Sequence, residues 1–482
     1  MFNFDRIIPR IMGIGEIQRQ SIISFVTQIL VQGVGFFSTI YFAHTLGAGV
    51  LGAYFLFMSY FGIISMVTDG GFGGAAIKRI SEGIEQNEYL SAFFAVRSLF
   101  VVLAVLALIL FRSYFVDINV SGVFIWLLLA LIVSIVSGTI SYGVAGCGKM
   151  GIFSTCRFIG EISRILLQIV AVYFGFGIAG IAGGLVAGLL IAAIIEWRFL
   201  DLHLVRFRWS HLKSLSTFSF WLFLTSGGVM LYSYSDTIMI GYFLSNADVG
   251  IYRVIFQFSG AAMFIANSLN AILWPKVSRW GKEGEIGLIE KSLSRAFSYS
   301  LVLAVPILAG GLLLGDRLLY FFYGADFARG FGTLVLLLVV QIISVFQMFL
   351  LMYLSALDRQ KYAFKVTAVA SIANILLNFI LIPVIGIAGA AFATLITMTL
   401  NAVLGHRLLS KMIKVKLENN TILNILKASS IMSVFIICYR LVIPLSSVWL
   451  TTLPVFFGGI IYVIMVLKLD RKIYDELKGI VM

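Results

Sequence analysis

The residues of this sequence with the clearest chemical potential are charged and amide side chains inside long apolar segments. A charged group is costly to place in lipid, so it usually faces a partner, an ion path or a ligand. Arginine donates two parallel hydrogen bonds to a phosphate or carboxylate, and a carboxylate can take up a proton or a metal cation. We therefore expect binding and coupling chemistry from these candidates: Asp69, Glu161, Arg164, Asp236, Arg253, Asn267 and Asn374.

Arg164 and Glu161 form the first candidate pair, because residues three apart share a helix face. A mutually neutralised structural pair is the alternative. An internal repeat, described below, aligns the two residues with the neutral Asn374 and Ser371, so the charges belong to one half of the chain. If the pair served helix packing that both halves require, it would occur in both halves. This asymmetry favours a substrate-binding role in a cavity.

Asp236 and Arg253 lie in consecutive apolar segments, at depths that permit an ion pair. Such a pair can latch two helices together, whereas a functional Asp236 would titrate or bind a cation, and the sequence leaves both open. Asp69 stands beside the glycine-rich run 70–74. It is either an acid in a helix-packing motif or, like Asp236, a coupling or gating residue.

The two asparagines also have two interpretations. Asn267 and Asn374 can line a path for a sugar, or they can form hydrogen bonds between helices. Arg97 and Glu196 lie near the ends of apolar segments. Long side chains in such places reach the membrane surface, and we expect these two to do the same.

The elements that carry these residues belong in a membrane. Of 482 residues, 60% are hydrophobic and only 12% are charged, whereas about 25% is usual in soluble domains. The net charge of +13 does not indicate nucleic-acid binding, because the basic residues are dispersed in short gaps between apolar segments. The three cysteines and four histidines have no metal-ligand, disulfide or catalytic spacing, so we expect no cofactor.

Apolar segments of about 20 residues predict an all-α membrane protein with fourteen spans. The first, near 20–44, exceeds the length of a signal peptide, and we expect it to be retained. If the N-terminus is cytoplasmic, most of the 35 lysines and arginines, Arg157 among them, lie on the cytoplasmic side. By the positive-inside rule both termini are then cytoplasmic. The opposite side has only Arg112, Arg317, Arg329 and Arg440.

The sequence also repeats itself. LGAGVLGAY at 46–54 resembles LSNADVGIY at 244–252, ILLQ at 165–168 resembles ILLN at 375–378, and GIAG occurs at both 177–180 and 386–389. Matches in the same order at similar offsets predict two six-helix copies that enter the membrane from the same face. The predicted parts are a first lobe at 1–198, a cytoplasmic linker at 199–215, a second lobe at 216–410, and two further helices with a cytoplasmic tail at 411–482.

These motifs resemble one known family. Asp69 ahead of GGFG, Asp236 ahead of Ile240-Gly241, VGIY at 249–252 and GIAGAAFAT at 386–394 are similar to the polysaccharide-exporter branch, the Wzx-like O-antigen flippases, of the multidrug/oligosaccharidyl-lipid/polysaccharide flippase superfamily. The resemblance implies two six-helix lobes in a V around a central cavity. It also implies transfer of a polyprenyl-diphosphate-linked oligosaccharide from the cytoplasmic to the outer leaflet by alternating access.

The resemblance implies the following partners: a lipid-linked oligosaccharide, membrane lipids and other membrane proteins of polysaccharide assembly, all at the cytoplasmic (inner) membrane. The coupling ion, H⁺ or Na⁺, is left open. A cation-coupled small-molecule or multidrug exporter of the same superfamily is the alternative, although Arg164 and Arg253 offset the negative cavity that drug cations prefer. A membrane-embedded enzyme would need a metal-binding DxD motif or a large catalytic loop. The sequence has neither, so we expect no enzymatic activity.

Overall fold

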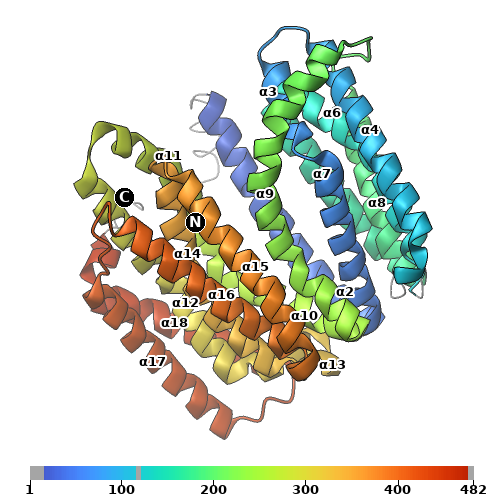
Figure 1. Cartoon of the computed structure of the whole chain (residues 1–482). Coiled ribbons are helices and arrows are strands. Elements are labelled where there is room, and N and C mark those ends of the chain that lie inside the picture. The colour runs from blue at the N-terminus through green and yellow to red at the C-terminus, as the bar shows by residue number, and fades with distance from the viewer. Residues whose placement is uncertain (1–15, 116–120, 476–482) are drawn as a thin grey trace, which may run out of the picture. The chain divides into compact units, whose positions relative to one another are not determined.

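Every element of the described chain is a helix. A computed structural model describes residues 16–115 and 121–475, without the side chains of 16–29, 221–222 and 224–233. Contacts divide the chain into two compact units, Met1–Tyr234 and Ser235–Met482, whose helices are labelled in Figure 1. The division lies C-terminal to the predicted linker 199–215, and the predicted domain limits stay a prediction.

The first unit consists of long helices with short connections. Its first element, α2 (Glu16–Asp69), is two helices joined at Gly47, where a φ of 74° and a ψ of 174° interrupt the helical backbone. Glycine adopts such a backbone at little cost because it has no Cβ. The other elements are α3 (Phe72–Ser81), α4 (Gln86–Leu110), the 3₁₀ turn η1 (Arg112–Tyr114), α6 (Phe124–Gly146), α7 (Met150–Tyr173), α8 (Gly177–Trp197) and α9 (Trp209–Phe243), which continues into the second unit.

The second predicted span, 51–77, is not one helix. α2 ends at Asp69, and Gly70 and Gly71, with φ of 53° and 79°, turn the chain before α3 begins. Two successive residues with positive φ require glycine in practice. The break leaves the Asp69 side chain at a helix end.

α7 and α8 pack closely because α8 presents a row of glycines to α7. Gly180, Gly184 and Gly188 recur at every fourth residue. A Cβ added to Gly184 would lie 2.4 Å from Cγ of Gln168. A Cβ added to Gly188 would lie 2.7 Å from Cβ of Arg164. Small residues at this spacing let helix backbones approach in a membrane, where van der Waals contact drives association.

Gly184→Ala should therefore destabilise the protein by about 1–3 kcal/mol, the usual cost of overpacking. The added methyl group would push α8 away from Gln168 and from the carbonyl oxygen of Arg164, which lies 3.3 Å from the ideal Cβ position. Detergent-driven unfolding of the purified protein measures this loss. Gly310→Ala is the control, because a Cβ there meets nothing within 4 Å, and it should be neutral or stabilising.

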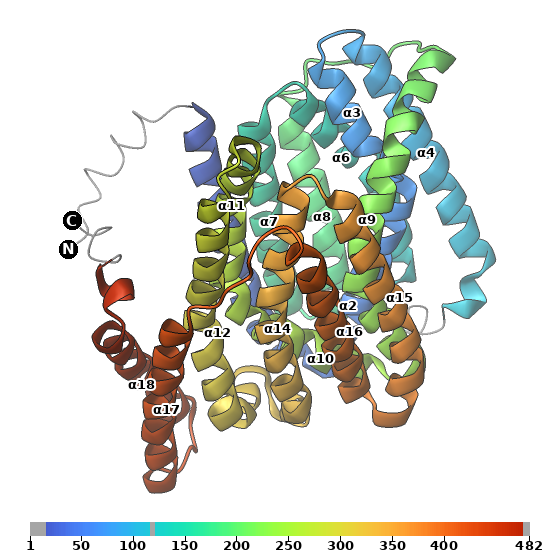
Figure 2. The same cartoon turned by 60° about the vertical axis from the view of Figure 1, so that its left-hand side comes forward.

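The second unit also consists of long helices with short connections. It begins with α10 (Asn246–Ser259), the 3₁₀ turn η2 (Gly260–Met263) and α11 (Phe264–Glu283), which together cover the predicted span 248–275. Figure 2 shows its last two helices side by side, next to α12. The remaining elements are α12 (Ile286–Tyr323), α13 (Ala325–Ala328), α14 (Phe331–Ala356), α15 (Gln360–Ile385), α16 (Ile387–Leu409), α17 (Asn419–Val442) and α18 (Val448–Leu469).

The helices of both units are suited to lipid. In the part of the chain that the structure describes, 11 helical segments are long and apolar enough to cross a membrane. Their lipid-compatible exteriors carry many large exposed apolar side chains, such as Leu110, Phe379 and Phe456. α7 is not among the 11; it carries Arg157, Glu161 and Arg164. The chain is thus a multi-pass helical membrane protein, and α7 carries charged residues that the site below uses.

Candidate functional site

A cavity of about 330 Å³ lies among the helices of the first unit. α2, α4, α6, α7 and α8 all contribute to its wall. Three arginines line it, together with one carboxylate, four serines and three aromatic rings. The lining residues used below are Ser134, Ser141, Arg97, Arg157, Glu161 and Arg164. This combination is suited to an anionic and hydroxyl-rich ligand, because guanidinium groups and hydroxyls offer directed hydrogen bonds in an otherwise apolar setting.

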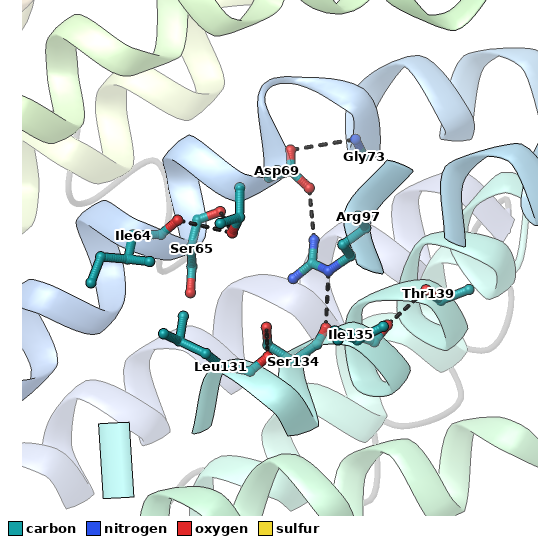
Figure 3. A network of polar contacts seen from close by, with 10 residues as sticks. Ile64, Ser65, Asp69, Gly73, Arg97, Leu131, Ser134, Ile135 and Thr139 are labelled. Carbon is teal, nitrogen blue, oxygen red and sulfur yellow. Dashed lines mark hydrogen bonds and ion pairs between the residues drawn. The ribbon is translucent and has the colours of Figure 1, made fainter. Parts of the chain in front are cut away.

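Arg97 enters the cavity from α4 and is held by Asp69. Its Nη1 lies 2.8 Å from Oδ1 of Asp69, and its Nε donates to the carbonyl oxygen of Ser134 at 3.0 Å. The other oxygen of Asp69 accepts from the backbone N–H of Gly73 at 3.3 Å, beyond the helix break, as Figure 3 shows. Gly138 makes room for the guanidinium, since a Cβ there would lie 2.7 Å from Cζ of Arg97. Asp69 is therefore one half of a buried ion pair.

The expectation that Arg97 and Glu196 reach the membrane surface was wrong. Arg97 is only 6% exposed and Glu196 is fully buried. Glu196 accepts a short hydrogen bond from the hydroxyl of Ser141 on α6. Glu196 lies near the end of α8 as predicted, but Arg97 lies near the middle of α4. Both side chains turn toward neighbouring helices, where a protein group replaces water as the partner.

Arg164 is the centre of a second polar group in the first unit. Its Nη2 lies 2.6 Å from Oε2 of Glu161, and its Nη1 donates to the hydroxyl oxygen of Tyr54 on α2 at 2.9 Å. Gln168 donates to the same hydroxyl at 2.9 Å and to the carbonyl oxygen of Ile181 at 2.6 Å. Arg164 and Glu161 are paired as the sequence suggested and also line the cavity, so the structural and binding interpretations are compatible.

The second unit contains a polar cluster around Asp236 of α9, which is 7% exposed. Its Oδ1 accepts a hydrogen bond from Nδ2 of Asn378 on α15 at 2.6 Å. Its Oδ2 accepts from the hydroxyls of Tyr252 on α10, at 2.7 Å, and Thr394 on α16, at 3.0 Å. Four helices thus converge on one carboxylate, and the three donors are neutral. Their dipoles stabilise a negative charge without cancelling it.

Asn374 belongs to this cluster in a supporting role. It is fully buried, and its Oδ1 accepts hydrogen bonds from Asn378 at 3.0 Å and from Ser235 at 3.2 Å. These contacts orient the amide that meets Asp236. The charge of Arg253 also acts on Asp236, and its guanidinium lies 5.6 Å from the ring of Phe256. Asn267 is an exposed residue of α11.

The polar clusters of the two units occupy equivalent positions of the sequence repeat. Tyr54 and Tyr252 end the matching motifs at 46–54 and 244–252, and Gln168 and Asn378 end ILLQ and ILLN. In the first unit the tyrosine accepts hydrogen bonds beside a guanidinium, whereas in the second it donates to a carboxylate. The same framework therefore holds a cation in one unit and an anion in the other.

Sequence reasoning overlooked several members of these sites. The tyrosines were seen only as repeat markers, although their recurrence at equivalent positions was a usable signal. Thr394 ends the GIAGAAFAT motif, whose role was not apparent until α16 was placed beside Asp236. Arg157 was counted as a topology signal, yet it lines the cavity. No feature of the neighbouring sequence distinguishes Arg157 from other basic residues near the end of a span.

The fold and these sites define a class: a helical membrane protein that carries polar clusters and an arginine-lined cavity inside its spans. Solved structures share the fold. A lipid II flippase MurJ in an inward closed conformation matches with a TM-score of 0.80 at 17% identity, over 94% of this chain and all of that chain. A multidrug resistance MATE family transporter of the MOP superfamily, in its inward-facing conformation, matches with a TM-score of 0.64 at 14% identity, over 81% of this chain and 97% of that one.

Sequence comparison gives the family. The model of the polysaccharide biosynthesis protein family matches residues 17–280, more than half of the chain, and the chain belongs to that family. It is 27% identical to the probable low-salt glycan biosynthesis flippase Agl15 of Haloferax volcanii, over 93% of this chain and 95% of the relative. It is 28% identical to the probable flippase AglR of the same organism, over 83% and 84%. The predicted resemblance to polysaccharide flippases is confirmed.

Proposed function

We propose that this protein is a flippase that moves a lipid-linked oligosaccharide from the cytoplasmic to the outer leaflet of the cell membrane. The cargo is a polyprenyl-diphosphate-linked unit of a surface glycan, comparable to an O-antigen repeat, and it is handled by alternating access. The chain crosses the membrane fourteen times with both termini in the cytoplasm. Lipid-linked oligosaccharide and the membrane enzymes that assemble the glycan are its partners.

The observation that carries this proposal is the arginine-lined cavity inside the spans of the first unit. A lipid-linked glycan is anionic and rich in hydroxyls, and its head must cross a medium that cannot solvate it. Arg97, Arg157 and Arg164 provide directed donors at that depth. Agl15 and AglR, two relatives that are similar over most of their length, carry the name of probable flippases, which supports the same role here.

We further propose that Asp236 couples transport to a cation, H⁺ or Na⁺. Buried carboxylates are costly when their charge is not compensated. The three hydrogen-bond donors to Asp236 are neutral, and Arg253 acts on it through its charge, so a proton or a small cation would complete the balance. Asp69 is assigned instead to holding Arg97, because its charge is already paired with that guanidinium at 2.8 Å.

A cation-coupled exporter of small molecules or drugs is the second candidate. The Asp236 cluster favours it, because such a transporter needs an ion site and not a glycan site. The three arginines of the first-unit cavity oppose it, because a cationic drug would be repelled there.

A reconstituted assay separates the two candidates. Liposomes that contain the protein would receive a fluorescent polyprenyl-diphosphate oligosaccharide, and the fraction accessible to an external sugar oxidase would be followed with time. Equilibration between leaflets that depends on the protein supports the flippase. Proton- or sodium-driven exchange of a cationic dye without any lipid transfer would instead establish the exporter.

Arg164→Ala should slow lipid-linked sugar transfer by about tenfold or more, equivalent to roughly 1.4 kcal/mol or more in the barrier, while leaving protein abundance unchanged. The side chains of Arg164 and Glu161 are 19% and 41% exposed, so loss of this partly solvated pair should cost only about 1 kcal/mol of stability or less. Transfer rates in liposomes and abundance in membranes are measured together. Arg329→Ala, which removes a pair with Asp248 outside the cavity, is the control, and parallel losses of abundance and transfer would make Arg164 purely structural.

A further inference from the structure

Arg157 differs from the other two arginines of the first-unit cavity. Arg97 is paired with Asp69 at 2.8 Å and Arg164 with Glu161 at 2.6 Å. Among the described residues, no carboxylate forms an ion pair with Arg157, whose guanidinium lies 5.7 Å from the ring of its neighbour on α7, Phe153. Two of the three cationic groups are thus compensated within the protein. Arg157 acts on the buried Glu196 through its charge and without an ion pair among the described residues, so its guanidinium remains available to a ligand.

The serines of α6 supply a complementary set of acceptors. The hydroxyl of Ser134 donates to the carbonyl oxygen of Leu131 at 2.7 Å, and the hydroxyl of Ser141 donates to Glu196. A hydroxyl whose hydrogen is already committed can still accept through its lone pairs. The α6 wall therefore presents oxygen acceptors, which suit the hydroxyl donors of a sugar ring. Glu196 itself is fully buried behind Ser141 and does not line the cavity.

Size and charge then restrict the ligand. A cavity of 330 Å³ is near the lower end of the ~300–1,000 Å³ found for small-molecule sites, which suits one sugar residue and not a whole oligosaccharide. Apart from the two ion pairs, the lining offers the one positive charge of Arg157, which the buried Glu196 behind Ser141 offsets in part. A diphosphate would bring at least two negative charges to it, whereas a sugar with one charged substituent would match it.

We infer that the first-unit cavity is a subsite for one sugar residue that carries a single negative charge, and that Arg157 binds this charge. The inference rests on the proposed function and specifies the class of glycan: an acidic one. The charge is a carboxylate or a phosphodiester on the sugar, for which the planar guanidinium provides two parallel hydrogen bonds. The serines of α6 and the aromatic rings of the lining hold the ring itself.

Labelling of the full-length purified protein with phenylglyoxal tests the inference without requiring transport. Peptide mass spectrometry would follow the modification of each arginine with no additive, or with glucose, sodium sulfate or sodium glucuronate. Glucuronate should slow the labelling of Arg157 by about fivefold or more, since a bidentate contact masks the guanidinium, and glucose and sulfate should have much weaker effects. Arg198, exposed at the end of α8 and outside the cavity, should be unaffected by all three. Equal protection by sulfate or glucose, or none by glucuronate, overturns the inference.

Arg157→Gln provides an independent check in liposomes with two lipid-linked sugars, one neutral and one bearing a glucuronate. It should slow transfer of the acidic cargo by about tenfold and leave the neutral cargo within about twofold of wild type. Arg157→Lys should restore part of the acidic transfer, and Arg198→Gln should match wild type. Equal slowing of both cargoes would overturn the assignment. If wild-type protein moves neither lipid, the proposed function fails, whereas the labelling result still decides whether the subsite exists.

Discussion

Asp69→Asn is expected to destabilise the protein by about 3 kcal/mol, the lower end of the range for removing one partner of a buried ion pair. The side chain of Arg97 is 7% exposed and that of Asp69 is 19% exposed. The variant leaves the guanidinium of Arg97 with an uncompensated charge, although the carbonyl oxygen of Ser134 still accepts its Nε hydrogen. The loss arises mainly from this stranded charge, because the net worth of an intact buried pair is small.

Equilibrium unfolding in mixed detergent micelles would measure the difference between wild type and Asp69→Asn. Asp69→Leu combined with Arg97→Met removes both charges, and this double variant should lie within about 1 kcal/mol of wild type. Arg79→Ala is the matched control, because Arg79 and Glu82 form a pair of similar length, 3.0 Å, at an exposed helix end. That change should cost less than about 1 kcal/mol. If Asp69→Asn costs no more than Arg79→Ala, the Asp69–Arg97 pair does not hold the cavity wall.

Asp236→Asn is expected to abolish the dependence of transport on the coupling cation and to lower its rate by at least about tenfold. The carboxylate is buried, and its three hydrogen-bond donors are neutral. An amide at this position keeps the size of the side chain but removes the negative charge that a proton or Na⁺ would balance. Because the amide adds a donor beside Tyr252, Asn378 and Thr394, the cluster must also rearrange.

Initial rates in liposomes, measured against sodium concentration at fixed pH and against pH at fixed sodium, identify the ion. Wild-type protein should respond to one of these two gradients, and Asp236→Asn to neither. Asp358→Asn is a control of the same chemical change at an exposed turn, where the φ of 61° is one that asparagine accepts readily. Unchanged ion dependence in Asp236→Asn would remove Asp236 from the coupling mechanism, and the cluster would then be a structural link among α9, α10, α15 and α16.

The shared framework of the two units bears on the Asp236 experiment. Tyr54 and Tyr252 stand at equivalent positions of the repeat, but one is beside Arg164 and the other beside Asp236. In the first unit the guanidinium of Arg164 is a permanent part of the cluster, because it belongs to the protein itself. In the second unit the charged group is the carboxylate of Asp236, and the proposed exchangeable cation would balance it together with Arg253. A difference of a few side chains can thus assign ligand binding to one unit and coupling to the other.

The amino-acid pattern was enough to establish the membrane setting, the helical class, the internal repeat and the family. These features are local or periodic: apolar segments of span length and basic residues in the gaps are visible without knowledge of which helices meet. The pair of Glu161 and Arg164 was also accessible, because residues three apart lie on one face of any helix. Its partner Tyr54, 110 residues away, was not.

Which charges meet depends on how the helices pack in the folded chain. Arg97 and Asp69 are 28 residues apart, and Asp236 is joined to Asn378 and Thr394 across 142 and 158 residues. The sequence shows how far along a helix a residue lies. The neighbours that its side chain meets depend on how the helices pack against one another. The turn at Gly70 and Gly71 and the glycine row of α8 set those neighbours. Side chains that seemed free to reach the membrane surface are therefore held inside, since a buried charge in lipid is stable only where another helix provides its partner.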